Sequence, residues 1–220
     1  MNSRSIPQAV IFFGPDGSGK TTQADLLVAE LNRRGMKNKK IWLRSLHTLA
    51  YAISIIAMHL LNLDSVYELR SKYARNRLFR TAWCAIEFIS ILGLIPLKFY
   101  LPMRRGYVIV AERFVVDWVV SLAFVVQDHS FVNSHISNLA LRCIPSHSLL
   151  IYIDANYDVI TTRRAIEDSN EFIEFQRSCY DIFANKLHAM RIDTSNKNID
   201  QVFKLIKDHI FQDDLKHYET

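Results

Sequence analysis

Short apolar runs rich in β-branched and aromatic residues recur along the chain, and segments with helical spacing of apolar residues separate them. The runs predict strands at about 8–13, 39–44, 106–112, 148–154 and 190–193. The other segments predict helices at about 21–34, 46–101, 115–127, 131–143, 156–167, 171–188 and 198–211. Strands that alternate with helices are typical of a parallel sheet covered on both faces. We therefore expect an α/β fold, with the whole chain, residues 1–220, as one domain.

The long helical region at about 46–101 should contain breaks near Asp64 and Pro96. Residues 45–63 carry no formal charge, over a length close to that needed to span a bilayer. The segment nevertheless includes polar residues, among them His47, Thr48, Ser54, His59 and Asn62. We expect a buried or interface helix here rather than a spanning one, with a peripheral membrane contact as the alternative.

Composition narrows the classes of function. Half of the 220 residues are hydrophobic, and the net charge is +5, which an anionic substrate explains as well as nucleic acid would. No RNA-binding signature or long basic tail is visible, so a nucleic-acid partner is not expected. The amino-terminal residues are polar and do not resemble a signal peptide, and the three cysteines lack metal-ligand spacing. These features favour a cytoplasmic protein with reduced thiols.

A glycine-rich loop connects the first predicted strand to the first helix. Residues 14–21 are Gly-Pro-Asp-Gly-Ser-Gly-Lys-Thr and match the P-loop pattern G-x-x-x-x-G-K-[ST]. In such a loop, backbone N–H groups cradle phosphates, Lys20 reaches the β- and γ-phosphates, and Thr21 binds Mg²⁺. The strand–loop–helix context argues against a chance match in a turn, so ATP and Mg²⁺ are the predicted cofactors. The predicted cofactor-binding residues are Gly14, Asp16, Gly17, Ser18, Gly19, Lys20, Thr21 and Thr22.

Charged residues also follow the other predicted strands, where ligands bind in parallel sheets. The second strand ends in Arg44, the third in Glu112 and Arg113, and the fourth in Asp154. A carboxylate there can hold Mg²⁺ through water, and an arginine can bind a phosphate through two hydrogen bonds. Asp154 could equally be a helix N-cap or turn residue, and a surface ion pair is the alternative for Arg113.

Several motifs resemble those of the thymidylate kinase family. The P-loop with Thr22-Gln23 is similar to its D-G-x-G-K-T-T-Q, and Glu112-Arg113-Phe114 is similar to a strand that ends in Asp-Arg-Tyr/Phe. Residues 150–155 followed by Arg163-Arg164 resemble a strand leading into an arginine-bearing lid. Residues 175–180 resemble the Phe-x-x-Arg-x-x-Tyr helix after the lid, and residues 192–195 resemble the last strand. The motifs occur in family order and cover most of the chain outside about 45–105.

The resemblance implies a P-loop nucleoside monophosphate kinase with a five-stranded parallel sheet, an ATP·Mg²⁺ donor and a nucleoside monophosphate acceptor, with dTMP favoured. It implies that Arg44 and Arg113 grip the acceptor phosphate, that Asp16 contacts the acceptor, and that Glu112 lies near the metal and the acceptor. By the same resemblance, Arg163 and Arg164 close over the transferring group from a short lid at about 160–175. The resemblance also implies a homodimer.

Other positions depart from the family pattern. Glu112 stands where the family has Asp, and the family's Arg-Glu-Pro-Gly stretch after the second strand is absent. The region 64–105, where the family builds its base pocket, aligns poorly. Within it, Arg70, Arg77 and Arg80 share a helical face and could reach an anionic acceptor, although a solvated face is favoured slightly. Arg77 is the member of this set that we assign to substrate binding.

Three functions remain to be compared. The favoured function is phosphorylation of dTMP to dTDP, and the alternatives are a P-loop kinase with a different small-molecule acceptor and a non-catalytic nucleotide-binding protein. A regulatory GTPase is not favoured. Residues 196–200 are Asn-Lys-Asn-Ile-Asp, one residue too long for the Asn-Lys-x-Asp that would read the guanine base.

Overall fold

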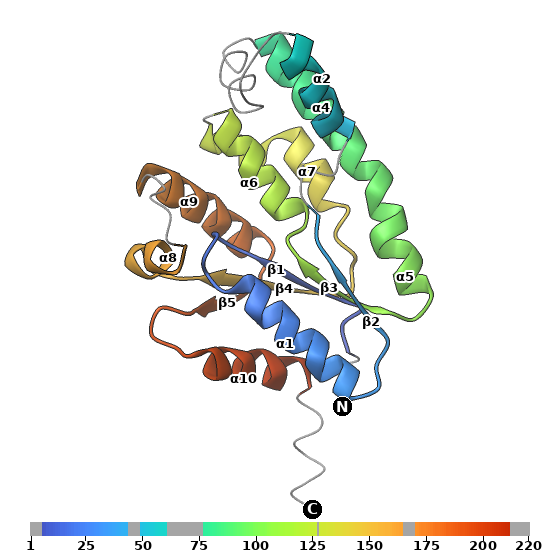
Figure 1. Ribbon diagram of the computed structural model, residues 1–220, viewed down its shortest axis with the longest axis vertical. Helices are drawn as coiled ribbons and strands as arrows, with labels where there is room; N and C mark the ends of the chain where they lie inside the picture. Colours follow the sequence, from blue (N-terminus) through green and yellow to red (C-terminus); the bar gives the residue numbers. More distant parts are fainter. Residues whose placement is uncertain (1–5, 44–48, 61–76, 127, 165–169, 212–220) are drawn as a thin grey trace, which may run out of the picture.

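A parallel β-sheet forms the middle of three layers (Figure 1). The computed structural model describes residues 6–43, 49–60, 77–126, 128–164 and 170–211. The strands are β1 (Ala9–Phe13), β2 (Asn38–Ile41), β3 (Val108–Glu112), β4 (Ser148–Asp154) and β5 (Met190–Asp193). Their order across the sheet is β2-β3-β1-β4-β5, and every neighbouring pair is parallel. This arrangement confirms the expected α/β class with five parallel strands.

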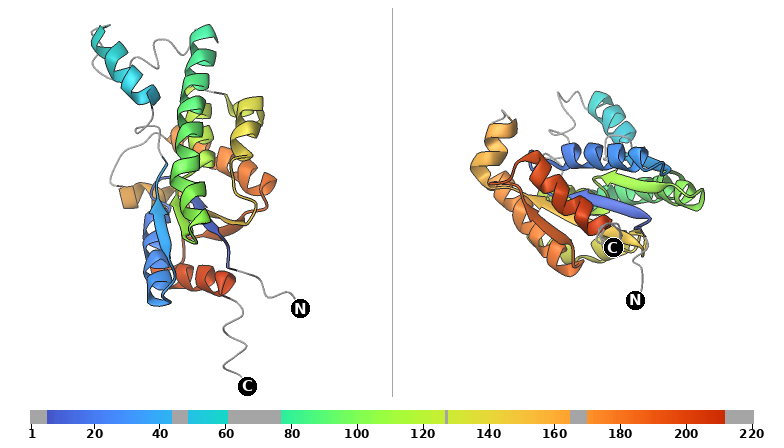
Figure 2. Two further views of the ribbon diagram at one scale, coloured as in Figure 1. Left: turned by 90° about the vertical axis from the view of Figure 1, so that its right-hand side faces the viewer. Right: turned by 90° about the horizontal axis from the view of Figure 1, so that it is seen from below.

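Helices cover both faces of the sheet, as Figure 2 shows from two further directions. The α-helices are α1 (Lys20–Arg33), α2 (Leu49–Leu60), α4 (Arg77–Ile95), α5 (Leu101–Arg104), α6 (Val115–Val125), α7 (His135–Leu141), α8 (Tyr157–Arg164), α9 (Asn170–Lys186) and α10 (Ile199–Ile210). A π-helical segment, η2 (Pro96–Tyr100), joins α4 to α5, and a 3₁₀ segment, η3 (His129–Asn133), precedes α7.

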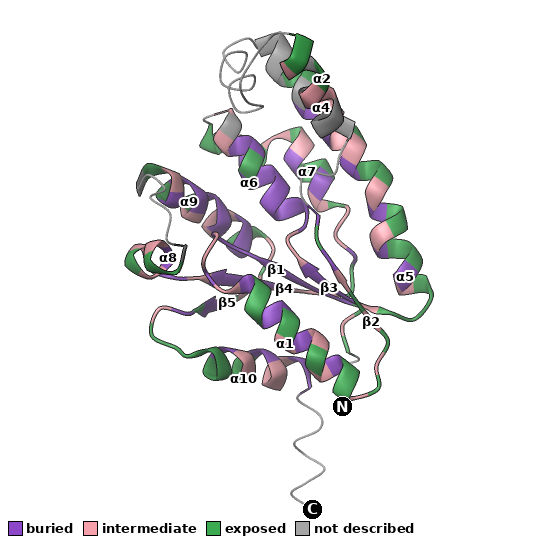
Figure 3. Cartoon of the chain, in the orientation of Figure 1, coloured by how far each residue is buried: buried purple, intermediate pink, exposed green. Residues whose placement is uncertain are grey.

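The alternation of side chains along β1 divides the core into two parts. Val10 and Phe12 point to one face and pack with apolar residues of α1 and α10. Ile11 and Phe13 point to the other face and pack with residues of α4, α6 and α9. Every residue of β1 is therefore buried, as Figure 3 shows by colour, and the carboxyl end of this central strand is held rigidly from both sides.

The helix that begins at Arg77 does not end at Pro96, where we expected a break. Its backbone ladder changes there to a π-helical turn in which the N–H of Leu101 donates to the carbonyl of Pro96. Proline has no N–H, and a local change of ladder lets the helix continue past it to Arg104. The break expected near Asp64 lies outside the described residues.

The described residues include one helical segment, Cys84–Arg104, that is long and apolar enough to cross a membrane by length and composition alone. It is not the uncharged segment 45–63 that the sequence singled out. The described part of that segment is α2, which has 12 residues.

Candidate active site

The P-loop connects the buried end of β1 to α1 and lies at the carboxyl edge of the sheet. Gly14 has a φ of 141°, and an added Cβ would lie 2.1 Å from the carbonyl oxygen of Ile153 on β4. A side chain at this position would clash with backbone, so the close approach of the loop to β4 requires glycine. The loop is thereby fixed against the end of the neighbouring strand.

Lys20 begins α1 and turns back into the loop. Its Nζ donates to the carbonyls of Gly14 and Pro15, at 2.6 Å each, and lies 3.7 Å from Oδ1 of Asp16. The side chain is only 4% exposed, and burial lowers its pKa to about 8, with a further lowering by Arg113 and a partial opposition by Asp16. The ammonium group is thus already poised at the loop, where phosphates would bind.

Thr21 is the next residue of α1, and its hydroxyl donates to Oε1 of Glu112 at the end of β3. The parallel register that pairs Phe12 with Glu112 brings these residues together although they are far apart in the sequence. The other carboxylate oxygen of Glu112 lies 3.0 Å from Nζ of Lys40, which also binds Asp25 at 2.6 Å. Burial acts to lower the pKa of Lys40, but the hydrogen bonds to Asp25 and Glu112 raise it overall.

The Thr21 and Glu112 oxygens fit a magnesium ion. Mg²⁺ prefers oxygen ligands and is commonly held by one or two protein groups together with waters and substrate phosphates. The described residues contain no cluster of three or more His, Cys, Asp or Glu side chains suited to a metal.

Arg113 follows Glu112 and has a φ of 82°, which is unusual for a residue with a side chain. Its backbone N–H donates to the carbonyl of Phe12, and its guanidinium forms an ion pair with Asp16 of the P-loop. The side chain is 16% exposed. The left-handed backbone thus serves to place this cation beside the P-loop.

A buried carboxylate, Asp117, lies behind Arg113 on the first turn of α6. It accepts hydrogen bonds from the Tyr180 hydroxyl at 3.0 Å and from the Phe114 N–H at 3.3 Å. Burial raises the pKa of Asp117, and the positive charges of Arg113 and Lys20 partly oppose this. Asp117 is not among the residues predicted from the sequence, although a lone acid within the run Val-Val-Asp-Trp-Val-Val was a usable signal.

Arg163 of α8 turns toward the end of β5. Its guanidinium donates to Oγ1 and O of Thr194, at 3.0 and 3.2 Å, and Oγ1 of Thr194 donates in turn to the carbonyl of Ser18 in the P-loop. The segment expected to be a lid is therefore linked to the phosphate loop through Thr194.

Asp154, at the end of β4, binds Arg177 of α9 through two hydrogen bonds of 3.0 and 2.8 Å. This arrangement is the bidentate pair that arginine forms best. It joins the sheet to α9 directly beside the site, so Asp154 serves here as the partner of an arginine.

The structure brings Lys20, Thr21, Asp16, Glu112 and Arg113 together at one edge of the sheet. For three other predicted residues the structure gives less information. Arg44 lies outside the described residues. Arg77 and Arg164 are described only as the first residue of α4 and the last residue of α8.

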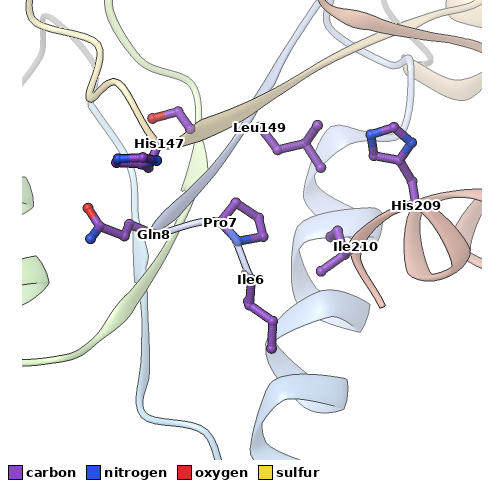
Figure 4. A pocket seen from close by; sticks show the side chains of 8 residues that line it. Ile6, Pro7, Gln8, His147, Leu149, His209 and Ile210 are labelled. Carbon is purple, nitrogen blue, oxygen red and sulfur yellow. The ribbon is translucent and has the colours of Figure 1, made fainter. Parts of the chain in front are cut away.

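A separate pocket of about 520 Å³ opens at the opposite, amino-terminal edge of the sheet (Figure 4). Its lining comprises Ile6, Pro7, Gln8, His147, Ser148, Leu149, His209 and Ile210. None of the predicted site residues lines it. We therefore take the P-loop edge, where the charged groups converge, as the candidate active site.

No family model matches the chain, and no curated protein matches it by sequence. Among solved structures, the chain is similar to a thymidylate kinase from Candida albicans, with a TM-score of 0.63 and 19% sequence identity. The match covers 95% of this chain and 93% of the other. At this identity the similarity shows a shared fold, which extends over nearly the whole length of both chains.

Proposed function

We propose that this protein transfers the γ-phosphoryl group of ATP to a nucleoside monophosphate, with dTMP as the favoured acceptor. The observation that carries the proposal is the meeting of Lys20, Thr21, Glu112 and Arg113 at one edge of the sheet. A P-loop lysine and threonine serve the donor, while a second cation beside them is suited to an acceptor phosphate. The shared fold with a thymidylate kinase and the sequence motifs support the same reaction class.

We assign the charged residues to the donor phosphates, the acceptor phosphate and the transferring group. Lys20 and the loop N–H groups bind the donor phosphates, and Arg113 binds the acceptor phosphate, with Arg44 and Arg77 as further acceptor contacts. Arg163 and Arg164 offset charge on the transferring group, and Asp16 contacts the acceptor. Thr21 and Glu112 would hold magnesium, which would offset negative charge on the donor phosphates. An acceptor phosphate is already nucleophilic, so no general base is assigned.

Two further features complete the proposal. We place the acceptor-binding helices at about 45–105 and a short lid at about 160–175 within one domain, and we expect a homodimer. We also expect the protein to work in the cytoplasm, where ATP is available and Cys84, Cys143 and Cys179 would stay reduced, as the free thiols they are here. Light scattering in solution tests the homodimer.

Transfer from ATP·Mg²⁺ to a panel of nucleoside monophosphates, headed by dTMP and dUMP, tests the reaction. Saturable formation of dTDP, reduced by about 10²–10³-fold or more in Lys20→Ala, is the expected result. ATP binding without transfer to any monophosphate would reject the nucleoside monophosphate as acceptor. It would favour the alternatives of another acceptor or a non-catalytic nucleotide-binding protein.

A further inference from the structure

The continuous helix α4–α5 lies along the outside of the molecule, with exposed residues along its length (Figure 3), and α2 packs beside α4. The exposed residues of α2 and α4–α5 form an apolar face. Between residues 82 and 101, every described exposed residue is uncharged: Ala82, Ile89, Leu92, Gly93, Pro96, Leu97, Tyr100 and Leu101. Ile89 is 66% exposed and Leu97 is 63% exposed. A solvent-facing helix normally carries charged residues on its outer face, as α10 does with Asp200 and Lys204.

Helix α2 extends this face. It has no charged residue over its 12 positions, and none of its described side chains is buried. Ile56 is 60% exposed and Leu60 is 78% exposed. A helix that is apolar on all sides is typical of a protein core or of a membrane, and α2 packs on the described residues mainly through α4.

The inner side of α4 packs against the core of the protein. Cys84, Ile91, Ile95 and Phe99 are buried in the core cluster below it. The carboxylate of Glu87 is buried and accepts a hydrogen bond of 3.1 Å from Nε1 of Trp118 on α6. Since this side cannot leave the core without exposing Glu87 to lipid, α4 is suited to lie on a membrane and not to cross it.

The charges bordering the face are basic. Lys98 is partly buried, and Arg104 and Arg105 are exposed at the carboxyl end of α5. Residues 77–106 include only one acid, the buried Glu87. Exposed Tyr100 and Tyr107 lie near the same end, and aromatic and basic residues beside an apolar surface are typical of the lipid headgroup region.

A second copy of the chain is a poorer partner for this face. A parallel pairing of two α4–α5 helices would bring Arg104 and Arg105 of both copies together. An antiparallel pairing would bring them to the amino end of α4, where the sequence has Arg77 and Arg80. Within residues 77–106 the one acid is the buried Glu87, so neither arrangement of these helices pairs Arg104 and Arg105 with an exposed acid of the same segment. Anionic lipid headgroups would neutralise these two arginines.

We propose that the apolar face of α2 and α4–α5 docks on the surface of an anionic phospholipid bilayer. This inference does not depend on the proposed reaction. The exposed leucine and isoleucine side chains enter the boundary between headgroups and acyl chains, and the arginines contact lipid phosphates. The P-loop residues remain with the body of the protein, outside the lipid.

Co-sedimentation of the full chain with vesicles of phosphatidylcholine, about a quarter of it replaced by phosphatidylglycerol, tests the proposal. We expect wild-type protein to pellet with these vesicles and not without them. Ile89→Ser with Leu97→Ser should weaken partition to the vesicles by about tenfold or more, because each substitution removes most of an aliphatic side chain from the contact with lipid. Both side chains are exposed, so the fold should tolerate the change.

The matched control is Ile199→Ser with Leu205→Ser, which removes two exposed apolar side chains from α10 on another side of the molecule. This pair should bind vesicles like the wild type. Arg104→Glu with Arg105→Glu should abolish the preference for anionic over neutral vesicles. Equal sedimentation of wild type and Ile89→Ser/Leu97→Ser would overturn the proposal. A second result would also overturn it: wild-type protein that does not bind the vesicles but forms a dimer, measured by light scattering, which Ile89→Ser with Leu97→Ser dissociates.

Discussion

Lys20 is the residue on which the proposed chemistry depends most. Its ammonium group is buried at the loop and should contact the donor phosphates, so Lys20→Ala should reduce phosphoryl transfer by about 10²–10³-fold or more. Steady-state turnover with ATP·Mg²⁺ measures the loss. Lys37→Ala, which removes a lysine from the connection before β2, is the control and should leave turnover unchanged. Turnover near the wild-type rate in Lys20→Ala would show that the active site is elsewhere.

The lowered pKa of Lys20 predicts how ATP binding depends on pH. An ordinary lysine stays protonated to about pH 10, whereas Lys20 loses its proton as the pH rises through about 8. The protonated form attracts phosphates, so ATP affinity should be full below pH 8 and then fall by up to about tenfold per pH unit. Calorimetric titration between pH 7 and 9.5 measures this. Lys20→Met should bind weakly with a flat profile over the same range, and a flat profile in the wild type would contradict the assignment.

Arg113 should affect the acceptor rather than the donor. Its guanidinium is paired with Asp16 of the P-loop. Arg113→Ala should lower kcat/KM for the acceptor by about 10²–10³-fold while ATP affinity changes by no more than about threefold. Arg33→Ala, an exposed arginine on α1, is the matched control. Equal losses for donor and acceptor would mean that Arg113 has been placed in the wrong half of the site.

At the level of the elements, Gly14 ties the P-loop to β4. Gly14→Ala should destabilise the fold by about 2–4 kcal/mol, because the new Cβ meets the Ile153 carbonyl at a backbone angle unfavourable for alanine. Gly35 also has a positive φ, of 68°, but an added Cβ there meets nothing within 4 Å. Gly35→Ala should therefore cost only about 1 kcal/mol. Urea midpoints of the two variants compare them directly, and similar losses would show that the contact with β4 is unimportant.

The contrast between β4 and β2 shows what the sequence could predict about the elements. The boundaries predicted for β4 and β5 agree with the structure, and in β4 the apolar run Leu-Leu-Ile-Tyr-Ile between Ser148 and Asp154 marks them. Strand β2 was expected to reach Arg44 but ends at Ile41. As an edge strand it pairs only with β3, and its sequence, Asn-Lys-Lys-Ile, has little of the apolar pattern from which strand ends are located.

The residues of the candidate site, like the strand boundaries, could be predicted only in part. The motifs indicated that Thr21, Glu112 and Arg113 would follow strand ends, and parallel strand ends meet at one edge. The pairs that fix their positions were not predictable: Arg113 with Asp16, Glu112 with Lys40, and Asp117 with Tyr180. Such pairs depend on strand register and side-chain direction, which periodicity does not determine.

For the whole molecule, ligand binding should appear as added stability, because a ligand that binds only the folded state stabilises it in proportion to its occupancy. ATP·Mg²⁺ at about 100 times its Kd should add about 2.7 kcal/mol, which for a domain of this size raises the Tm by about 5–10 °C. The same scan can rank candidate acceptors without requiring turnover. If the acceptor half of the site takes a nucleoside monophosphate, dTMP should raise the Tm of the wild type further and should fail to do so in Arg113→Ala. A shift with ATP·Mg²⁺ and none with any monophosphate would leave the P-loop assignment intact and reject the proposed acceptor, since the two halves of the site report separately in this measurement.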